Sequence, residues 1–516
     1  MEKDLDVTAV DYSLKKIARG GGLLFIGTVF GMGLHMVNRV LIVRSMSRTD
    51  YGIFSMGLVI FTMAGTLSQG GFSLSVPRFL GYYRGKKDKE RIMGVIRSSF
   101  EVELILAAGF LAFLFLGAGF LEDFYDMEGL TIIVRIFAVG IPVFILTQLI
   151  TDIFRGFDEV APTFYFSNIL LAGSRMTFLL VVALRAPSLL HTVAAYVAAM
   201  VATGILASFY YVKKRPIRGI VPITMRKELL LFSIPLFGTV FLAQIMKWTD
   251  VLMLGYFTPP DQVGLYNGAI PICVSIPVFL NSAGFIFIPV LSVLYSHGQF
   301  LEMKKTYSIL TKWIFSATLP LFLVIFIFAP QVLTLLFGAD YQQASTALRI
   351  LSAGYMFHVS TGPIGQNLVI FGRPRLIMAN NVAGVVVNII LNFFLIPRYG
   401  INGAAIATSS TYVALNVLAL LQVYRISGMH PFSITYVKPL SLSLVLSVIS
   451  YAAFRYGFPS SYWMIPLAAL LITGSYLLMI LVTKSFDRED VMLLKTVERR
   501  SGIRLTWMRK ILKKFL

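Results

Sequence analysis

Long apolar segments follow one another through almost the whole 516-residue chain. A helix needs about 20 mostly apolar residues to cross the hydrocarbon core of a bilayer, and the chain contains about 14 such segments. The sequence therefore predicts an all-α polytopic membrane protein with about 14 transmembrane helices. The predicted spans cover residues 20–43, 51–76, 92–118, 130–153, 162–184, 191–212, 228–250, 264–294, 306–329, 345–371, 376–396, 402–424, 435–456 and 461–483.

The composition excludes an ordinary water-soluble globular protein. Apolar residues make up 57% of the chain and charged residues 14%, whereas soluble domains carry about 25% charged residues. Transmembrane β-barrels have alternating segments of about ten residues, and the sequence lacks that pattern. The single cysteine, Cys273, cannot form a disulfide within the chain. The first apolar segment is long and lacks a cleavage site, which predicts an uncleaved first span.

Basic residues predict the orientation, because Lys and Arg accumulate in cytoplasmic loops. With the N-terminus inside, the inner segments hold 35 of the 45 Lys and Arg residues, and the outer loops hold five. Both ends, the arm 1–19 and the tail 484–516, are then cytoplasmic. Residues 501–516 form an amphipathic pattern typical of a helix on the membrane surface. The net charge of +20 thus indicates anionic membrane lipids as partners, not nucleic acid.

The chain also repeats itself. Residues 40–54 resemble residues 251–266, and Arg135 and Arg349 are equivalent at an offset of 214. A repeat of six spans enters the membrane in the same direction each time, which makes the repeat parallel. We therefore predict an N-lobe (20–220, spans 1–6), a C-lobe (221–430, spans 7–12), two further spans (431–483) and a cavity between the lobes.

Several ionisable residues lie within the spans, where each costs about 2.5–3.5 kcal/mol and usually faces a cavity or a partner. We interpret the cations as a substrate-binding cavity for an anionic head group, because Arg donates paired hydrogen bonds to phosphate. Alternatively, they form ion pairs or extend to the interface. The candidate cations are Arg39, Lys247, Arg175, Arg135 and Arg349, and the candidate polar or pairing residues are His35, Asn38, Asp250 and Gln244.

Two spans contain residues that permit bending. In span 2 these residues are Gly65, Gly70, Gly71 and Pro77. In span 8, which is unusually long, they are Pro271, Pro277, Gly284 and Pro289. Bends in equivalent helices are expected where two lobes rock, and static kinks that shape a cavity are the alternative.

Other classes of function lack their motifs. No G-x-x-x-x-G-K-[ST] segment is present, so ATP is not expected as a direct energy source. No His/Cys cluster suggests a metal, and no cofactor is expected. Enzyme chemistry is not expected either, because no outer loop is long enough for a folded domain.

Two segments resemble a known family. The segment Asn388–Thr411 (NIILNFFLIPRYGINGAAIATSST) and the segment Asn38–Arg78 with its DYG turn resemble signatures of the polysaccharide-biosynthesis, or oligosaccharide flippase, family. That family belongs to the multidrug/oligosaccharidyl-lipid/polysaccharide exporter superfamily. The resemblance covers roughly residues 10–480 and implies two six-helix lobes, in agreement with the repeat.

The resemblance implies translocation of an undecaprenyl- or dolichyl-linked oligosaccharide to the outer leaflet of the plasma membrane, with glycan assembly enzymes as partners. Arg39 and Lys247 fit the basic groups on the first helices of the two lobes in related lipid II flippases; Asp250 departs from that pattern and offers an ion pair. The alternative is a cation-coupled multidrug exporter, which predicts a buried acidic site among Glu101, Glu103 and Asp152. A membrane scaffold would leave the buried charges unexplained.

Overall fold

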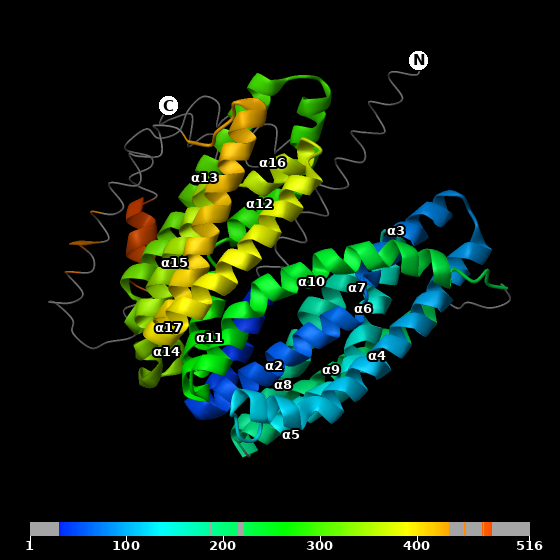
Figure 1. Cartoon of the computed structure of the whole chain (residues 1–516), viewed down its shortest axis with the longest axis horizontal. Coiled ribbons are helices and arrows are strands. Elements are labelled where there is room, and N and C mark those ends of the chain that lie inside the picture. The colour runs from blue at the N-terminus through cyan, green and yellow to red at the C-terminus, as the bar shows by residue number, and fades with distance from the viewer. Residues whose placement is uncertain are drawn as a thin grey trace. The chain divides into compact units, whose positions relative to one another are not determined.

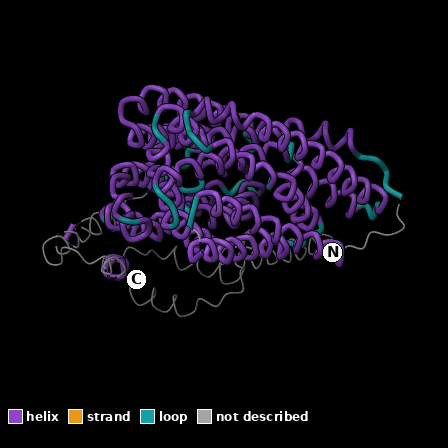
Figure 2. Tube along the Cα trace, turned by 90° about the horizontal axis from the view of Figure 1, so that it is seen from below, coloured by secondary structure: helices purple, strands orange, loops and turns teal. Residues whose placement is uncertain are grey.

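The computed structural model describes residues 30–185, 187–214 and 221–432, with parts of 445–452 and 467–476. Within these residues the secondary structure is helical and contains no strand (Figure 2). The described residues fall into two compact units. The first unit comprises residues 30–267 and 388–404, and the second comprises residues 268–387 and those after 404. The predicted all-α polytopic architecture is confirmed.

The first unit begins with a helix over residues 30–44. Packing pairs α2 with α5 and α10, α3 with α6, α4 with α5, and α8 with α9 (Figure 1). In chain order its labelled elements are α2 (Arg48–Ser68), α3 (Phe72–Gly85), α4 (Lys89–Tyr125), α5 (Leu130–Val139), α6 (Ile141–Gly156), α7 (Val160–Thr163), the π-helix η1 (Phe164–Leu170), α8 (Leu171–Arg185), α9 (Leu189–Lys214), α10 (Arg226–Phe257) and the first half of α11 (Pro260–Val274).

The second unit contains the rest of α11 and the helices that follow it. Helix α13 packs against α12 and α15, and α12 packs against α16. In chain order the elements are α12 (Val278–Ser296), α13 (Phe300–Ile327), α14 (Ala329–Phe337), the 3-10 helix η2 (Ala339–Ala344), α15 (Ser345–Ser360), α16 (Ile364–Ile370) and α17 (Pro374–Ser427), whose residues 388–404 belong to the first unit.

Each predicted span from the second to the twelfth coincides with helix. Eight helices of the described residues are long and apolar enough to cross a membrane, or nine if a bent pair forms one span. The number is lower than the prediction partly because α17 contains two predicted spans joined at Gly400, whose backbone is not helical (φ 54°, ψ −130°). Asn380 and Gln422 exchange hydrogen bonds at 2.8 Å, so the two halves of α17 run antiparallel as a hairpin.

Local sequence explains where the helices begin and bend. Ser47 caps α2, because its hydroxyl accepts from the Asp50 N–H at 3.1 Å. Span 2 breaks between α2 and α3, where Gly71 has φ 82° and a Cβ would lie 2.5 Å from the Ser233 carbonyl. Span 8 bends by 49° between α11 and α12, next to Pro277. Breaks therefore exist at two of the predicted places, Gly70–Gly71 and Pro277. The other residues predicted to permit bending lie within helices: Gly65, Pro77, Pro271, Gly284 and Pro289.

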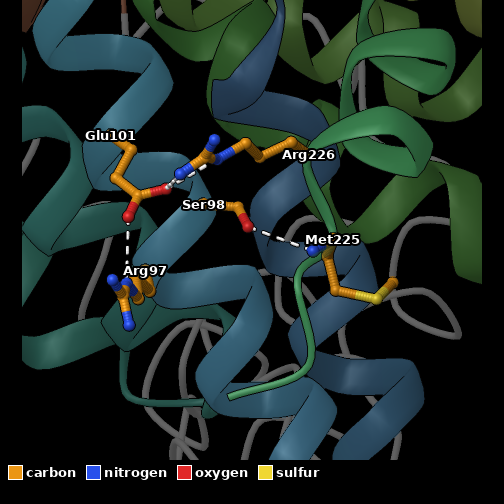
Figure 3. A network of polar contacts seen from close by, with 5 residues as sticks. All are labelled: Arg97, Ser98, Glu101, Met225 and Arg226. Carbon is orange, nitrogen blue, oxygen red and sulfur yellow. Dashed lines mark hydrogen bonds and ion pairs between the residues drawn. The ribbon is translucent and has the colours of Figure 1, made fainter.

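Three loops predicted to be cytoplasmic meet at one end of the first unit. Arg84 pairs with Asp158, and Lys214 pairs with Glu159. The segment before α10 lies along α4: the Met225 N–H donates to Ser98 Oγ at 3.1 Å, and Glu101 bridges Arg97 and Arg226 (Figure 3). These contacts agree with the prediction that the three loops lie on one side of the membrane.

Some predictions concern residues that the structure does not describe. The arm 1–19, residues 20–29 of span 1, most of the segment 431–483 and the tail 484–516 lie outside the described residues. Helix α10 packs against α2, α3 and α4 within the first unit, although the sequence repeat assigns it to the C-lobe. The lobe boundaries 20–220 and 221–430 stay predictions.

Candidate functional site

The first helix packs against span 5 through Gly31 and the candidate residue Asn38. A Cβ on Gly31 would lie 3.3 Å from the Asn168 side chain, and Asn38 Nδ2 donates to the Ala172 carbonyl at 2.8 Å. Asn38 is 4% exposed, and its Oδ1 has no hydrogen-bond partner. Span 5 is irregular here, because η1 is a π-helix, a form that often occurs at functional sites. No pattern in the sequence predicts this π-helix.

Arg39 and Arg175 come together in the first unit, from the first helix and from α8. Their charges act on each other and on the His35 ring, which lies one turn before Arg39. Arg39 Nη1 donates to the Tyr51 hydroxyl at 2.7 Å. The Arg175 guanidinium lies 3.9 Å from the centre of the Tyr196 ring.

No carboxylate of the described residues lies within ion-pair distance of Arg39 or Arg175. The Arg175 Nε is also buried without a hydrogen-bond partner. Guanidinium groups seldom remain unpaired in an apolar environment. We name Arg39, Arg175, His35 and Asn38 the arginine cluster.

Three further predicted residues lie on α10 of the same unit. Lys247 is exposed, and its ammonium lies 4.7 Å from the centre of the Trp248 ring. Asp250 is 8% exposed and accepts from the Tyr266 hydroxyl at 2.9 Å and from Asn392 at 3.0 Å. Neither Lys247 nor Arg39 pairs with it in the described part of the chain. Gln244 is half-buried, one turn before Lys247.

Arg135 and Arg349 make equivalent contacts, as their positions in the repeat predict. Arg135 Nε donates to the Phe115 carbonyl at 3.2 Å, and Arg349 Nε donates to the Phe326 carbonyl at 3.0 Å. In each case the guanidinium binds main chain of the preceding long helix. The two residues belong to different units, and the contact to Phe115 gives Arg135 a structural role.

The three acidic candidates have different environments. Glu101 is part of the ion-pair network at the surface (Figure 3). Asp152 is 5% exposed and pairs with Arg155 at 2.7 Å. Glu103 is 2% exposed, and its Oε2 has no hydrogen-bond partner. Among the described residues, no group of three or more His, Cys, Asp or Glu side chains could hold a metal ion.

Sequence reasoning missed two tyrosines that contact the arginine cluster. Tyr51 accepts the hydrogen bond from Arg39, and Tyr196 lies beneath Arg175. Both lie in apolar spans, where an aromatic residue is ordinary core, so only the proximity of a cation distinguishes them.

Two family models match the sequence. The model described as polysaccharide biosynthesis protein matches residues 17–295, and the MatE model matches residues 235–394. The first match covers more than half of the 516 residues.

Curated relatives carry related descriptions. The probable low-salt glycan biosynthesis flippase Agl15 of Haloferax volcanii is 28% identical over 172 residues, which is 33% of this chain and 36% of that protein. The chain therefore spans only about a third of that relative's length. The putative O-antigen transporter of Shigella flexneri is 24% identical over 392 residues, which is 74% of this chain and 91% of that protein.

A solved structure has the same fold. The lipid II flippase MurJ, in an inward closed conformation, aligns with a TM-score of 0.72 at 15% identity and covers 89% of this chain and 98% of that chain. At this identity the likeness concerns the fold alone. The match over residues 17–295 shows that the chain belongs to the polysaccharide biosynthesis protein family.

Proposed function

We propose that the chain is a flippase that moves a polyprenyl- or dolichyl-(pyro)phosphate-linked oligosaccharide from the cytoplasmic to the outer leaflet of the plasma membrane by alternating access. Both termini lie in the cytoplasm, and enzymes of glycan assembly supply the substrate. The descriptions of the Haloferax and Shigella relatives as a glycan biosynthesis flippase and an O-antigen transporter support this substrate class.

The arginine cluster is the observation that carries the proposal. Two guanidinium groups within the membrane repel each other, and no described carboxylate neutralises them. Insertion of each cation into the membrane costs about 2.5–3.5 kcal/mol. An anion that binds between the two guanidinium groups therefore offsets part of this free-energy cost. The planar forks of Arg39 and Arg175 suit phosphate oxygens. We assign the head-group phosphate to these two residues, with Lys247 as a further cation.

A reconstitution assay tests this proposal. The purified protein in liposomes should make a polyprenyl-linked glycan accessible to an external glycan-binding probe. Arg39→Ala and Arg175→Ala should each abolish this transfer, because the one remaining guanidinium supplies too few hydrogen-bond donors for the phosphate oxygens. Arg135→Ala is the matched control: its side chain is exposed and contacts main chain, so this variant should keep transport. Each variant must show the wild-type thermal midpoint and elution volume before transport is compared.

Normal glycan transfer by both Arg39→Ala and Arg175→Ala would remove the arginine cluster from the mechanism. Absence of transfer by the folded wild-type protein, with several lipid-linked glycans, would contradict the flippase proposal itself.

The MatE match over residues 235–394 favours a second candidate, a cation-coupled exporter of small molecules. That function requires a buried acidic group, and Glu103 and Asp152 are the buried carboxyl groups among the three acidic candidates. Cation-dependent dye efflux from vesicles, without any movement of glycan and with loss of efflux in Glu103→Gln, would favour the exporter.

A further inference from the structure

A groove of about 660 Å³ lies on the second unit between α15 and the part of α17 after residue 404. The two helices approach closely at Gly354, because a Cβ there would lie 2.7 Å from the Ser409 Cα. Small side chains, including Ala353 and Ala414, line the groove and leave it hollow.

One end of this groove is polar. Arg349, Thr346 and Ser410 line it there. Arg349 is anchored by main chain at the end of α13, where its Nε donates to the Phe326 carbonyl at 3.0 Å. A guanidinium has five N–H donors, so most of them remain for another acceptor. No carboxylate of the described residues lies within ion-pair distance of Arg349.

The remainder of the groove is apolar. Phe357, Val413 and Ala414 line it beyond the polar end. Arg349 and Phe357 are eight residues apart on one helix, which at 1.5 Å per residue is about 12 Å. The groove therefore presents a fixed cation at one end and an apolar channel along the helices, which matches the two parts of an anionic lipid.

The first unit contains the equivalent groove, and it lacks the polar end. That groove, of about 570 Å³, lies between α5 and α9 and is lined by apolar residues throughout. Ile136 and Val139 there correspond to Ile350 and Ala353 at the offset of 214. The same packing thus forms with only apolar side chains lining the groove, so the hydroxyls of Thr346 and Ser410 are not needed to pack the helices.

We propose that the groove between α15 and α17 binds one anionic phospholipid, with its phosphate on Arg349 and an acyl chain along Ala353, Phe357 and Val413. Charge complementarity selects the ligand, since Arg forms charge-assisted hydrogen bonds with phosphate. Lipid tails are as apolar as the groove, so the acyl chain adds little preference over the surrounding bilayer. The head group therefore determines binding. This lipid belongs to the membrane and is separate from any transported substrate.

Native mass spectrometry of the full chain in a neutral detergent tests the proposal. After removal of lipid, the protein is titrated with dioleoylphosphatidylglycerol or dioleoylphosphatidylcholine. The wild-type protein should bind one phosphatidylglycerol preferentially. Arg349→Gln should weaken that binding at least about tenfold, as expected for loss of a charge-assisted hydrogen bond. Arg135→Gln is the matched control and should bind as the wild type does.

A second variant keeps the test valid if Arg349→Gln does not fold. Ala414→Trp fills the groove at an exposed position and leaves Arg349 in place, and it should lose the bound lipid equally. Wild-type binding by either groove variant would overturn the proposal. So would equal binding of phosphatidylcholine, or binding of a polyprenyl phosphate but not phosphatidylglycerol. A shift to dimers on removal of lipid, with no lipid preference, would mean that a second copy covers the groove.

Discussion

Gly94 shows how a single missing side chain allows the segment before α10 to lie on α4. A Cβ at this position would lie 1.7 Å from the Ile223 carbonyl, and the Ile223 N–H donates to the Glu90 carbonyl at 3.3 Å. Even alanine cannot fit unless the segment moves. The contacts of Ser98 and Glu101 follow on the same face of α4 (Figure 3).

We therefore expect Gly94→Ala to lower stability by about 1–3 kcal/mol, the usual cost of overpacking. Gly109→Ala is the control on the same helix, because no heavy atom lies within 4 Å of a Cβ there. This control should be neutral or stabilising, since alanine is the better helix former. Thermal unfolding in detergent measures both. Equal midpoints for the two variants would contradict the contact.

Glu103 allows a second prediction for a single residue. Its Oε2 is buried without a partner, which costs about 1–3 kcal/mol relative to an apolar side chain of similar shape. Glu103→Met should therefore raise the thermal midpoint. Glu101→Met should lower it, because Glu101 holds Arg97 and Arg226. A lower midpoint for Glu103→Met would mean that this carboxyl group has a structural partner.

At the scale of elements, the helical hairpin of α17 explains why several residues of the segment that resembles the family signature are glycine or asparagine. Gly400 provides the turn with a φ of 54°, and a Cβ on Gly403 would lie 2.2 Å from the Leu395 carbonyl, where the chain folds back. Asn392, in the first arm, donates to Asp250. The segment Asn388–Thr411 thus specifies the connection between two antiparallel helices.

Replacement of Gly400 should disturb this hairpin. A non-glycine residue held in such a sparsely populated region costs about 1–3 kcal/mol, so Gly400→Ala should lower the thermal midpoint. Gly365→Ala, on α16, is the control, because its backbone is not left-handed and a Cβ there meets nothing within 4 Å. An unchanged midpoint for Gly400→Ala would mean that the turn adopts another conformation.

The sequence predicted the positions of the helices better than it predicted which side chains are in contact. Apolar length and turn residues located the helices and the interruptions at Gly71 and Pro277, because both are local properties of the chain. The predicted cations exist within helices, but which of them meet depends on side chains far apart in sequence. Arg39 and Arg175 share a neighbourhood, whereas Arg135 contacts main chain of α4 instead. The π-helix at Phe164–Leu170 had no sequence signal.

At the scale of the whole molecule, the two copies of the repeat share some contacts and differ in others. Arg135 and Arg349 keep the same main-chain contact across an offset of 214, so that contact belongs to the shared fold. The grooves beside them differ, because only the second has a polar end. Features common to both copies are thus explained by folding, and features of one copy are better candidates for ligand binding.

The orientation of the chain gives a last prediction. Cys273 is fully buried, so a membrane-impermeant maleimide should leave the native protein unlabelled. Glu128 and Lys89 are exposed, and the charge pattern predicts the first outside and the second inside. In intact cells, Glu128→Cys should react and Lys89→Cys should not, and permeabilisation should make Lys89→Cys reactive. A Cys273→Ser background controls for the native thiol. The reverse pattern would invert the topology, and reaction of both variants in intact cells would contradict the predicted loop assignment.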